Sequence, residues 1–134
     1  MKSLLILIGL ALALMLYIRL APSDPTRWHV TLETPQDRDT MGSATRVLPG
    51  QAGRMNDLHR VALATPRTRL LAGGPGQGHA TYVTRSLLWG FPDYTTVWTD
   101  GDALVLHGRL RFGRGDMGVN RRRIEGWIAA LNAT

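Results

Sequence analysis

The chain begins with an apolar run, Leu4–Ile18, that no charged residue interrupts, and it is flanked by Lys2 and Arg19. A cleaved signal peptide has an apolar stretch of about 7–15 residues, whereas a membrane-spanning helix needs roughly 20. If the two flanking cations reach out to opposite membrane surfaces, the run meets the lower limit for spanning. Prolines crowd the one tolerable cleavage site, near Ala21. We therefore predict that residues 1–21 are a retained transmembrane signal anchor, with a cleaved signal peptide as the alternative.

The sequence constrains the orientation of this anchor only weakly. Positive charge is found before the apolar run, at Lys2, and also after it, at Arg19 and Arg27. The excess of cations on one side, which normally sets orientation, is therefore small. A very short positive head is typical of a signal anchor, and it favours an outer, periplasmic location for the rest of the chain. The opposite orientation stays open.

Composition indicates that the remaining residues form one small basic domain. The chain has 134 residues, of which 44% are hydrophobic and 19% are charged, as is typical of folded domains. Its formal net charge is +6, and arginine supplies every cation except Lys2. This charge indicates anionic partners such as lipid headgroups or acidic protein surfaces. The absence of cysteine excludes disulfides, thiolate nucleophiles and cysteine-based zinc sites.

Hydrophobic periodicity predicts an α+β domain, in which a small antiparallel sheet carries two packed helices. Residues 22–53 are rich in Pro, Gly, Asp and Thr, so we expect a tether and surface loops there. One short edge strand is expected within them, around Trp28, Val30 and Leu32. The α+β domain is expected over residues 54–134. Its expected elements are a helix at 55–64, strands at 67–72, 80–89, 94–99 and 103–112, and a final helix with Ile124, Trp127, Ile128 and Leu131 on one stripe.

Three turn signals connect these strands. Gly73–Gly78 indicates a flexible hairpin loop, and Pro92-Asp93 indicates the middle of a turn. Asp100-Gly101 is typical of a two-residue hairpin turn. With that turn, Val97 lies opposite Leu104 on the apolar face that the helices cover.

The other face of this predicted hairpin interleaves aromatic and cationic side chains, with Tyr94 beside His107. One interpretation is a solvated outer face whose arginines stack on aromatic rings. The other is a docking surface for a partner protein or an anionic ligand. Together with two members of the closing arginine cluster, the candidate anion- or partner-binding residues are Arg85, Tyr94, Trp98, His107, Arg109, Arg111, Arg121 and Arg123.

That cluster, Arg121–Arg123, lies close to the expected start of the final helix at Asp116 or Asn120, both good N-cap types. Helix N-termini carry a partial positive charge, so cations there are unfavourable unless a negative group compensates them. We expect Asp116, Asp93 or Glu125 to accept two of these arginines, Arg121 and Arg123. An external anion such as a phospholipid headgroup, or a partner's carboxylate, is the alternative.

The helical phase separates the arginines further. With Ile124 at the centre of the apolar stripe, Arg121 borders the packed seam while Arg122 projects toward water. We therefore expect Arg121→Ala to lower the melting temperature and Arg122→Ala to leave it unchanged.

Two stretches, YVTRSLLWGFPDYTTV and RLRFGRGDMGVNRRRIEGW, resemble the bacterial and plastid family called domain of unknown function 1499. The resemblance runs over residues 65–131, and the anchor followed by RLAPSDPTRWH is similar to the membrane-tethered members. The family has no established biochemical activity, so the resemblance implies context and no chemistry. Gly115 stands where the closing motif of the family has serine. The motif residues that the resemblance implies are Trp89, Gly90, Phe91, Pro92, Asp93, Asp116, Gly118 and Asn120.

No pattern in the sequence indicates a catalytic, metal or cofactor site. The four histidines lack the spacing of metal ligands. Ser86, Asp93 and His107 could be arranged as a hydrolytic triad, but no nucleophile-elbow sequence supports it. Gly73–Gly78 lacks the lysine and the helix start of a phosphate loop. The charge suits nucleic acid, but the membrane anchor and the single lysine argue against that partner.

These features predict a non-enzymatic, single-pass membrane protein whose basic domain lies at the bilayer surface and carries no cofactor. There we expect it to act as an accessory or assembly component of an integral membrane protein complex. The alternative is a domain that binds lipid, anionic lipid included, or a small anionic ligand, in an apolar pocket under Trp89 and Phe91. An enzyme is a third alternative, and a buried carboxylate beside His107 would be its structural sign.

Overall fold

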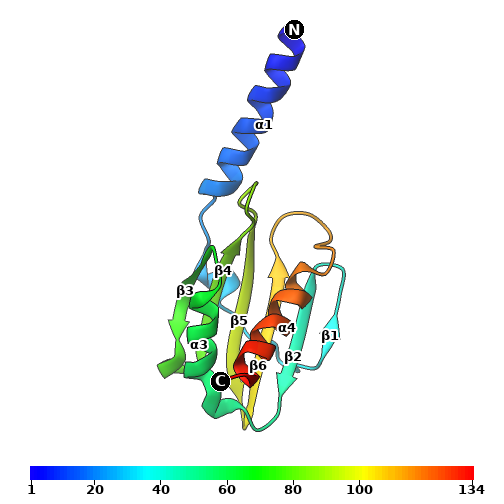
Figure 1. The fold of residues 1–134 in the computed structure, drawn as a ribbon. Coiled ribbons are helices and arrows are strands. Elements are labelled where there is room, and N and C mark those ends of the chain that lie inside the picture. The colour runs from blue at the N-terminus through cyan, green and yellow to red at the C-terminus, as the bar shows by residue number, and fades with distance from the viewer.

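A computed structural model describes residues 1–134 as an apolar helix joined to one α+β domain (Figure 1). Helix α1 (Lys2–Leu20) projects away from the domain, and its mean hydropathy of 2.4 and its length would allow it to cross a membrane. An N-terminal helix of this kind is a membrane anchor or a signal sequence. The other elements, in chain order, are α2 (Pro25–Trp28), β1 (Arg38–Asp39), β2 (Ser43–Leu48), η1 (Ala52–Arg54), α3 (Met55–Ala64), β3 (Thr68–Gly74), η2 (Pro75–Gln77), β4 (His79–Arg85), β5 (Pro92–Asp100), β6 (Ala103–Leu110) and α4 (Val119–Asn132).

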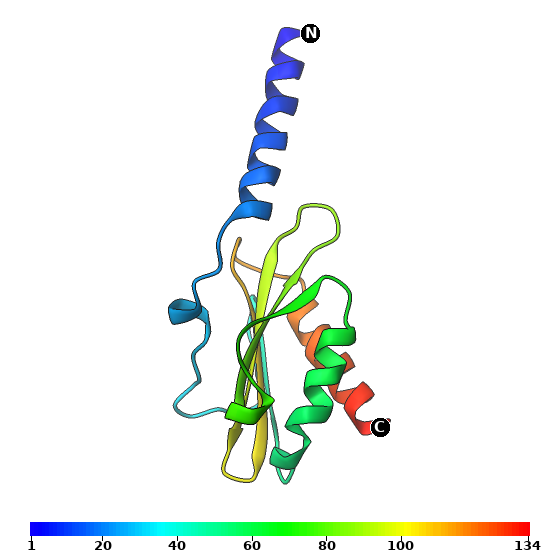
Figure 2. The same ribbon diagram turned by 90° about the vertical axis from the view of Figure 1, so that its left-hand side faces the viewer.

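The domain has three layers, and the α+β class is confirmed. Its six strands form one antiparallel sheet in the order β1-β2-β6-β5-β4-β3. Helices α3 and α4 cover one face of the sheet, and the chain between α1 and β1 crosses the other face (Figure 2). The sheet is therefore buried on both sides along much of its middle, although no helix lies on the second face apart from the single turn of α2.

The core lies between the sheet and the two long helices. Val97, Leu104 and Leu106 of the central hairpin are fully buried against α4, which contributes Ile124 and Trp127. Each such side chain stabilises the fold by about 1.5–3 kcal/mol through burial. The apolar residues whose helical spacing predicted both helices are thus the residues that pack against the sheet.

The central hairpin keeps its predicted faces but shifts its register by two residues. Asp100 pairs with Ala103, so Gly101-Asp102 form the turn, and Val97 lies opposite Leu106 instead of Leu104. Gly101 has φ +59°, a value that glycine tolerates at the first turn position. Because side chains alternate with a period of two, this shift leaves every residue on its predicted face.

Two predicted turns have different outcomes. Gly73–Gly78 does join two antiparallel strands, with the short helix η2 inside it. Pro92 and Asp93, expected in the middle of a turn, instead begin β5, where Pro92 pairs with Arg85. Proline is tolerated at the first residue of a strand, and the reversal lies within residues 86–91.

Residues 22–53 depart most from the expected tether. Trp28 belongs to the turn of α2, whose start is capped by the Asp24 carboxylate, so the short strand expected around Trp28, Val30 and Leu32 is absent. Two strands that the sequence interpretation missed, β1 and β2, come from this region, and β2 pairs with β6 along its whole length. The sheet therefore extends outside the expected domain range of 54–134.

Candidate functional site

The face that interleaves aromatic and cationic side chains is covered by the protein's own chain. Tyr94 is fully buried and Trp98 nearly so. The ring of Trp28 stacks on that of Tyr94, with a centroid distance of 4.0 Å and an interplanar angle of 14°. The expectation of an exposed outer face is therefore wrong at its centre, because residues expected in a tether pack across it. A partner could contact Tyr94 and Trp98 only if residues 22–36 first moved off this face of the sheet.

The arginines of this face fasten that covering segment. Arg109 donates to the Thr96 hydroxyl at 2.7 Å and to the Trp28 carbonyl oxygen. Burial lowers the pKa of Arg109 to about 10, as expected for a guanidinium that has no carboxylate partner. Arg111 donates to the Pro22 carbonyl at 2.7 Å and to the Tyr94 hydroxyl at 3.1 Å. These contacts explain why both cations lie on this face.

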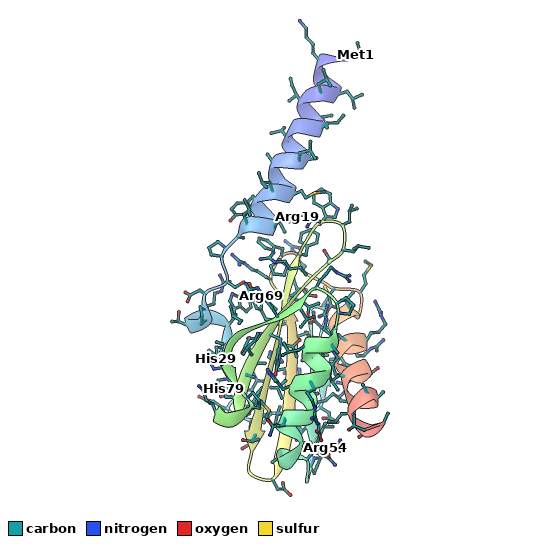
Figure 3. All side chains as sticks on the ribbon, turned by 60° about the vertical axis from the view of Figure 1, so that its left-hand side comes forward. Met1, Arg19, His29, Arg54, Arg69 and His79 are labelled. Atoms are coloured by element: carbon teal, nitrogen blue, oxygen red, sulfur yellow. The ribbon has the colours of Figure 1, made fainter.

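Three histidines also lie on the covered face. The rings of His29 and His79 stack at 3.6 Å, and His29 Nδ1 lies 2.9 Å from the Thr81 hydroxyl. Figure 3 labels this stacked pair beside β4. His107 Nδ1 lies 2.8 Å from the Thr45 hydroxyl, and burial, with Arg109 nearby, lowers the pKa of His107 to about 4. Burial likewise lowers the pKa of the stacked pair, so all three imidazoles are neutral near pH 7.

The structure does not assemble a hydrolytic triad from the residues considered for it. Asp93 projects to the helix face, where it contacts Asn120 and Arg123, while His107 lies on the opposite face beside Thr45. The Ser86 hydroxyl accepts the backbone N–H of Phe91. No carboxylate is hydrogen-bonded to His107. No group of three or more potential metal-ligating side chains is gathered in the domain.

The start of α4 explains how the arginine cluster is compensated. The Asp116 carboxylate accepts the backbone N–H groups of Gly118 and Asn120 at 2.9 and 3.0 Å, and the Asn120 side-chain amide at 2.8 Å. Burial raises the pKa of Asp116, but these hydrogen bonds outweigh it and the net shift is downward. Asp116 is thus an ionised group at the helix N-terminus, where it opposes the partial positive charge.

Of the three arginines, Arg123 is the one that packs. It is 13% exposed and contacts Asp93, itself 14% exposed, at 3.4 Å, and it donates to Asn120 Oδ1 at 2.9 Å. Arg121 is exposed, so the prediction that it borders the seam is wrong. Arg122 is exposed as predicted. The buried stripe also includes Asn120, which moves its centre by roughly 30° toward Arg123.

The last turn of α1 is built into the domain through Arg85. This guanidinium donates to the carbonyl oxygens of Ile18 and Gly90 at 3.0 and 2.9 Å, and to that of Ala21 at 3.4 Å. Carbonyls at the C-terminal end of a helix have no partner within the helix, so a cation there satisfies them. Ile18 itself is 3% exposed. The helix and the domain therefore meet at a packed junction.

Arg19 makes the reciprocal contact. It extends from α1 to the loop between β4 and β5, where it donates to the carbonyl oxygens of Leu87 and Leu88. Its side chain lies against Gly90, where a Cβ atom would be 2.6 Å from Arg19 Cγ. Gly90 also has φ +74°, which L-residues rarely adopt. This family-motif glycine is therefore required both by its conformation and by the approach of Arg19.

Aromatic and aliphatic side chains surround this junction, at what we call the anchor-side end, residues 86–91 and 111–118 beside α1. Phe112 lies edge-on to Tyr17 of α1, and Phe91 lies between Phe112 and Trp89. Two leucines of the same end, Leu87 and Leu88, are 74% and 67% exposed. Exposed apolar side chains are therefore grouped at the end of the domain that adjoins α1.

An arginine-lined pocket opens at the same end, on the face that residues 22–36 also cover. It has a volume of about 390 Å³, and it is lined by Arg19, Arg67, Arg69 and Arg85 together with Thr68, Val83 and Ser86. Arg69 pairs with Val83, so it lies on the face of Arg85. Arg67 precedes β3 with φ +56°, and it is joined to Arg85 by donating from Nε to the Arg85 carbonyl. Figure 3 labels Arg19 at the foot of α1 and Arg69 on β3 below it.

A family model described as protein of unknown function (DUF1499) matches residues 18–131. The chain belongs to this family. No curated protein matches the chain. The resemblance noted in the two sequence motifs is therefore confirmed, and the match covers α1's last turn as well as the whole sheet.

In this DUF1499 chain, the motif residues build the anchor-side end. The Asp116 carboxylate accepts the N–H of Asn120 in the first turn of α4, and Gly118, with φ +77°, precedes the first residue of the helix. Trp89 and Phe91 form the aromatic contact beside α1. A separate pocket of about 360 Å³ lies beside Phe91. Trp89 does not line it, so this pocket differs from the apolar pocket expected under both residues.

Sequence reasoning missed three of the four arginines in the arginine-lined pocket of this DUF1499 chain. Arg85 was a candidate, whereas Arg19, Arg67 and Arg69 were not. One local signal existed, because Arg67 and Arg69 alternate along a predicted strand and so share a face. Their meeting with Arg19 depends on the docking of α1, which no local pattern encodes.

Proposed function

We propose that this chain is a non-enzymatic, single-pass membrane protein whose basic domain rests directly on the bilayer surface. There it acts as an accessory or assembly component of an integral membrane protein complex. The observation that carries the proposal is the packed junction between α1 and the domain. A domain fastened to its own apolar helix is held within contact distance of whatever that helix enters.

The junction supports retention of α1 as an anchor. Removal of residues up to Ala21 would delete the two carbonyls that Arg85 holds, at Ile18 and Ala21, and also Arg19. A signal peptide is ordinarily removed without loss of contacts in the mature fold, so such dependence favours an anchor. We place the domain on the periplasmic side, as the short positive head of the chain favours.

Exposed methionines support a protein partner. Met117 is 91% exposed and Met41 74% exposed, and Met117 also lines the 360 Å³ pocket beside Phe91. Methionine is enriched at protein–protein interfaces because its flexible thioether adapts to different partners. Met117 belongs to the anchor-side end, and Met41 adjoins it, since its carbonyl accepts the Asp116 N–H at 3.0 Å. A neighbouring membrane protein would meet the domain at this end.

Photo-cross-linking of the full chain in its native membrane tests this proposal. A photoreactive amino acid at Met117 is expected to cross-link to an integral membrane protein, and one at Ala130, exposed near the far end of α4, is not. The intact mass of the purified chain should include residues 1–21. Equal cross-linking at both positions, or a mature chain without the apolar helix, would contradict the proposal.

A second candidate function is binding of lipid or a small anion at the membrane surface. The arginine-lined pocket favours it, because that pocket lies beside the last turn of α1 and no acidic residue lines it. This function does not need a protein partner.

A further inference from the structure

The structure assigns the arginine-lined pocket as a binding site for the phosphate group of an anionic phospholipid, in the leaflet that meets the C-terminal end of α1. This inference goes beyond the proposed accessory role, but it rests on the proposed placement of the domain at the bilayer.

The charge of the pocket is uncompensated. None of its four arginines forms an ion pair. No carboxylate lines the pocket. Burial and the neighbouring cations Arg69, Arg111 and Arg19 lower the pKa of Arg85, which is the signature of a crowded positive site. A bound anion would relieve this repulsion.

Three of the four guanidinium groups are held in place by carbonyl oxygens. Arg85 donates to three carbonyls and Arg19 to two. Arg67 Nε donates to the Arg85 carbonyl at 3.0 Å. A carbonyl oxygen fixes the position of a cation but, unlike a carboxylate, does not neutralise it. Arg69 makes no side-chain hydrogen bond and is exposed, so it can turn toward a ligand.

This arrangement suits a phosphate group. Arginine presents a planar fork of N–H donors that matches two phosphate oxygens at once. Ser86 also lines the pocket, and its hydroxyl accepts the Phe91 N–H. A volume of about 390 Å³ can hold a phosphate together with its ester substituents.

The position of the pocket identifies a lipid as the source of that phosphate. Arg19 lines the pocket and belongs to the last turn of the spanning helix, so the site opens at headgroup level. The adjoining loop exposes Leu87 and Leu88, which can contact acyl chains. Tyr17, which contacts Phe112 beside the same turn, is a residue of the kind found where membrane meets water.

Lipid titration of the full chain in a neutral detergent tests the site, with native mass spectrometry as the readout. The probes are dihexanoyl phosphatidylglycerol, dihexanoyl phosphatidylcholine and inorganic phosphate. Arg69→Gln is the test variant, and Arg121→Gln is its matched control. Both side chains are exposed, neither forms an ion pair, and each change removes one charge. Neither is expected to change the unfolding midpoint.

One equivalent of phosphatidylglycerol should bind in preference to phosphatidylcholine. Arg69→Gln should weaken that binding by about tenfold, as expected for a hydrogen bond to a charged group, and Arg121→Gln by less than about twofold. Equal weakening by the two variants would overturn the site, because it would indicate general charge attraction. Inorganic phosphate binding as tightly as phosphatidylglycerol would overturn the assignment to lipid. The titration contains no partner protein, so a negative result would not contradict a positive cross-link at Met117 or the accessory role that it supports.

Discussion

Trp28 tests whether residues 22–36 are part of the folded domain or a tether. Its side chain is 9% exposed, stacks on Tyr94 and lies under the Arg109 guanidinium, 5.6 Å from its ring centroid. Removal of a buried tryptophan side chain costs about 3–5 kcal/mol. The stacked aromatic pair contributes about 0.5–1.5 kcal/mol beyond burial. Because the site is near the surface and can partly collapse, we expect Trp28→Ala to lose about 3 kcal/mol.

The measurement is urea unfolding of the full chain in detergent, followed by far-ultraviolet circular dichroism. Two matched variants serve as controls for the loss of stability. Trp28→Phe keeps a ring on Tyr94 and should lose less than half as much stability. Val30→Ala, at a position 46% exposed in the same segment, should stay within about 0.5 kcal/mol of the parent. If Trp28→Ala also stays within that range, the covering segment contributes nothing and the argument is refuted.

Three further predictions follow from the same structure. Arg123→Ala leaves the buried carboxylate of Asp93 unpaired and should cost about 2–3 kcal/mol in urea unfolding, whereas Arg122→Ala should cost less than about 0.5. Because the pKa of His107 is lowered to about 4, its neutral imidazole stabilises the fold fully above about pH 6.5, and this stabilisation is lost as the pH falls toward about 4. Between pH 7 and 4.5, the free energy of unfolding should fall by about 2 kcal/mol more in the parent than in His107→Asn. Gly90→Ala forces φ +74° on a residue whose Cβ meets Arg19, and should speed amide hydrogen exchange across residues 86–91.

Equal costs for the two arginine variants would place the wrong arginine in the packed seam. A parent protein whose stability does not fall between pH 7 and 4.5 would contradict the buried, neutral imidazole. Unchanged exchange in Gly90→Ala would mean that Arg19 does not hold the loop.

The parts of the fold that follow local rules could be predicted from the sequence. The stripe through Ile124, Trp127 and Leu131 gave α4 its packed face, and Asp100-Gly101 marked the central hairpin. The predicted faces of the hairpin residues are correct although the register differs by two residues, because side chains along a strand alternate between the two faces with a period of two. Of the three carboxylates expected to accept the arginine cluster, Asp93 pairs with Arg123, whereas Asp116 accepts N–H groups at the start of α4 and no arginine.

The remaining features depend on contacts between distant parts of the chain. Residues rich in proline and polar side chains suggested a tether, but Trp28 finds Tyr94 across 66 positions of sequence. Strand β2 has no strong alternation and gains its place by pairing with β6. Arg121 was expected at the packed seam because the stripe was centred on Ile124, but Asn120 is buried as well and Arg123 is the arginine that packs. The arginine-lined pocket requires the docking of α1, which no local pattern predicts.

The central claim is that α1 stays in the bilayer and holds the anchor-side end against it. Since the chain has no cysteine, single nitroxide labels can be placed at Leu88→Cys and, as a control, Ala130→Cys. In nanodiscs, power saturation should show the label at Leu88 accessible to oxygen and shielded from a water-soluble nickel chelate, with the reverse at Ala130. If both labels are equally accessible to the chelate, the domain is not held at the membrane surface.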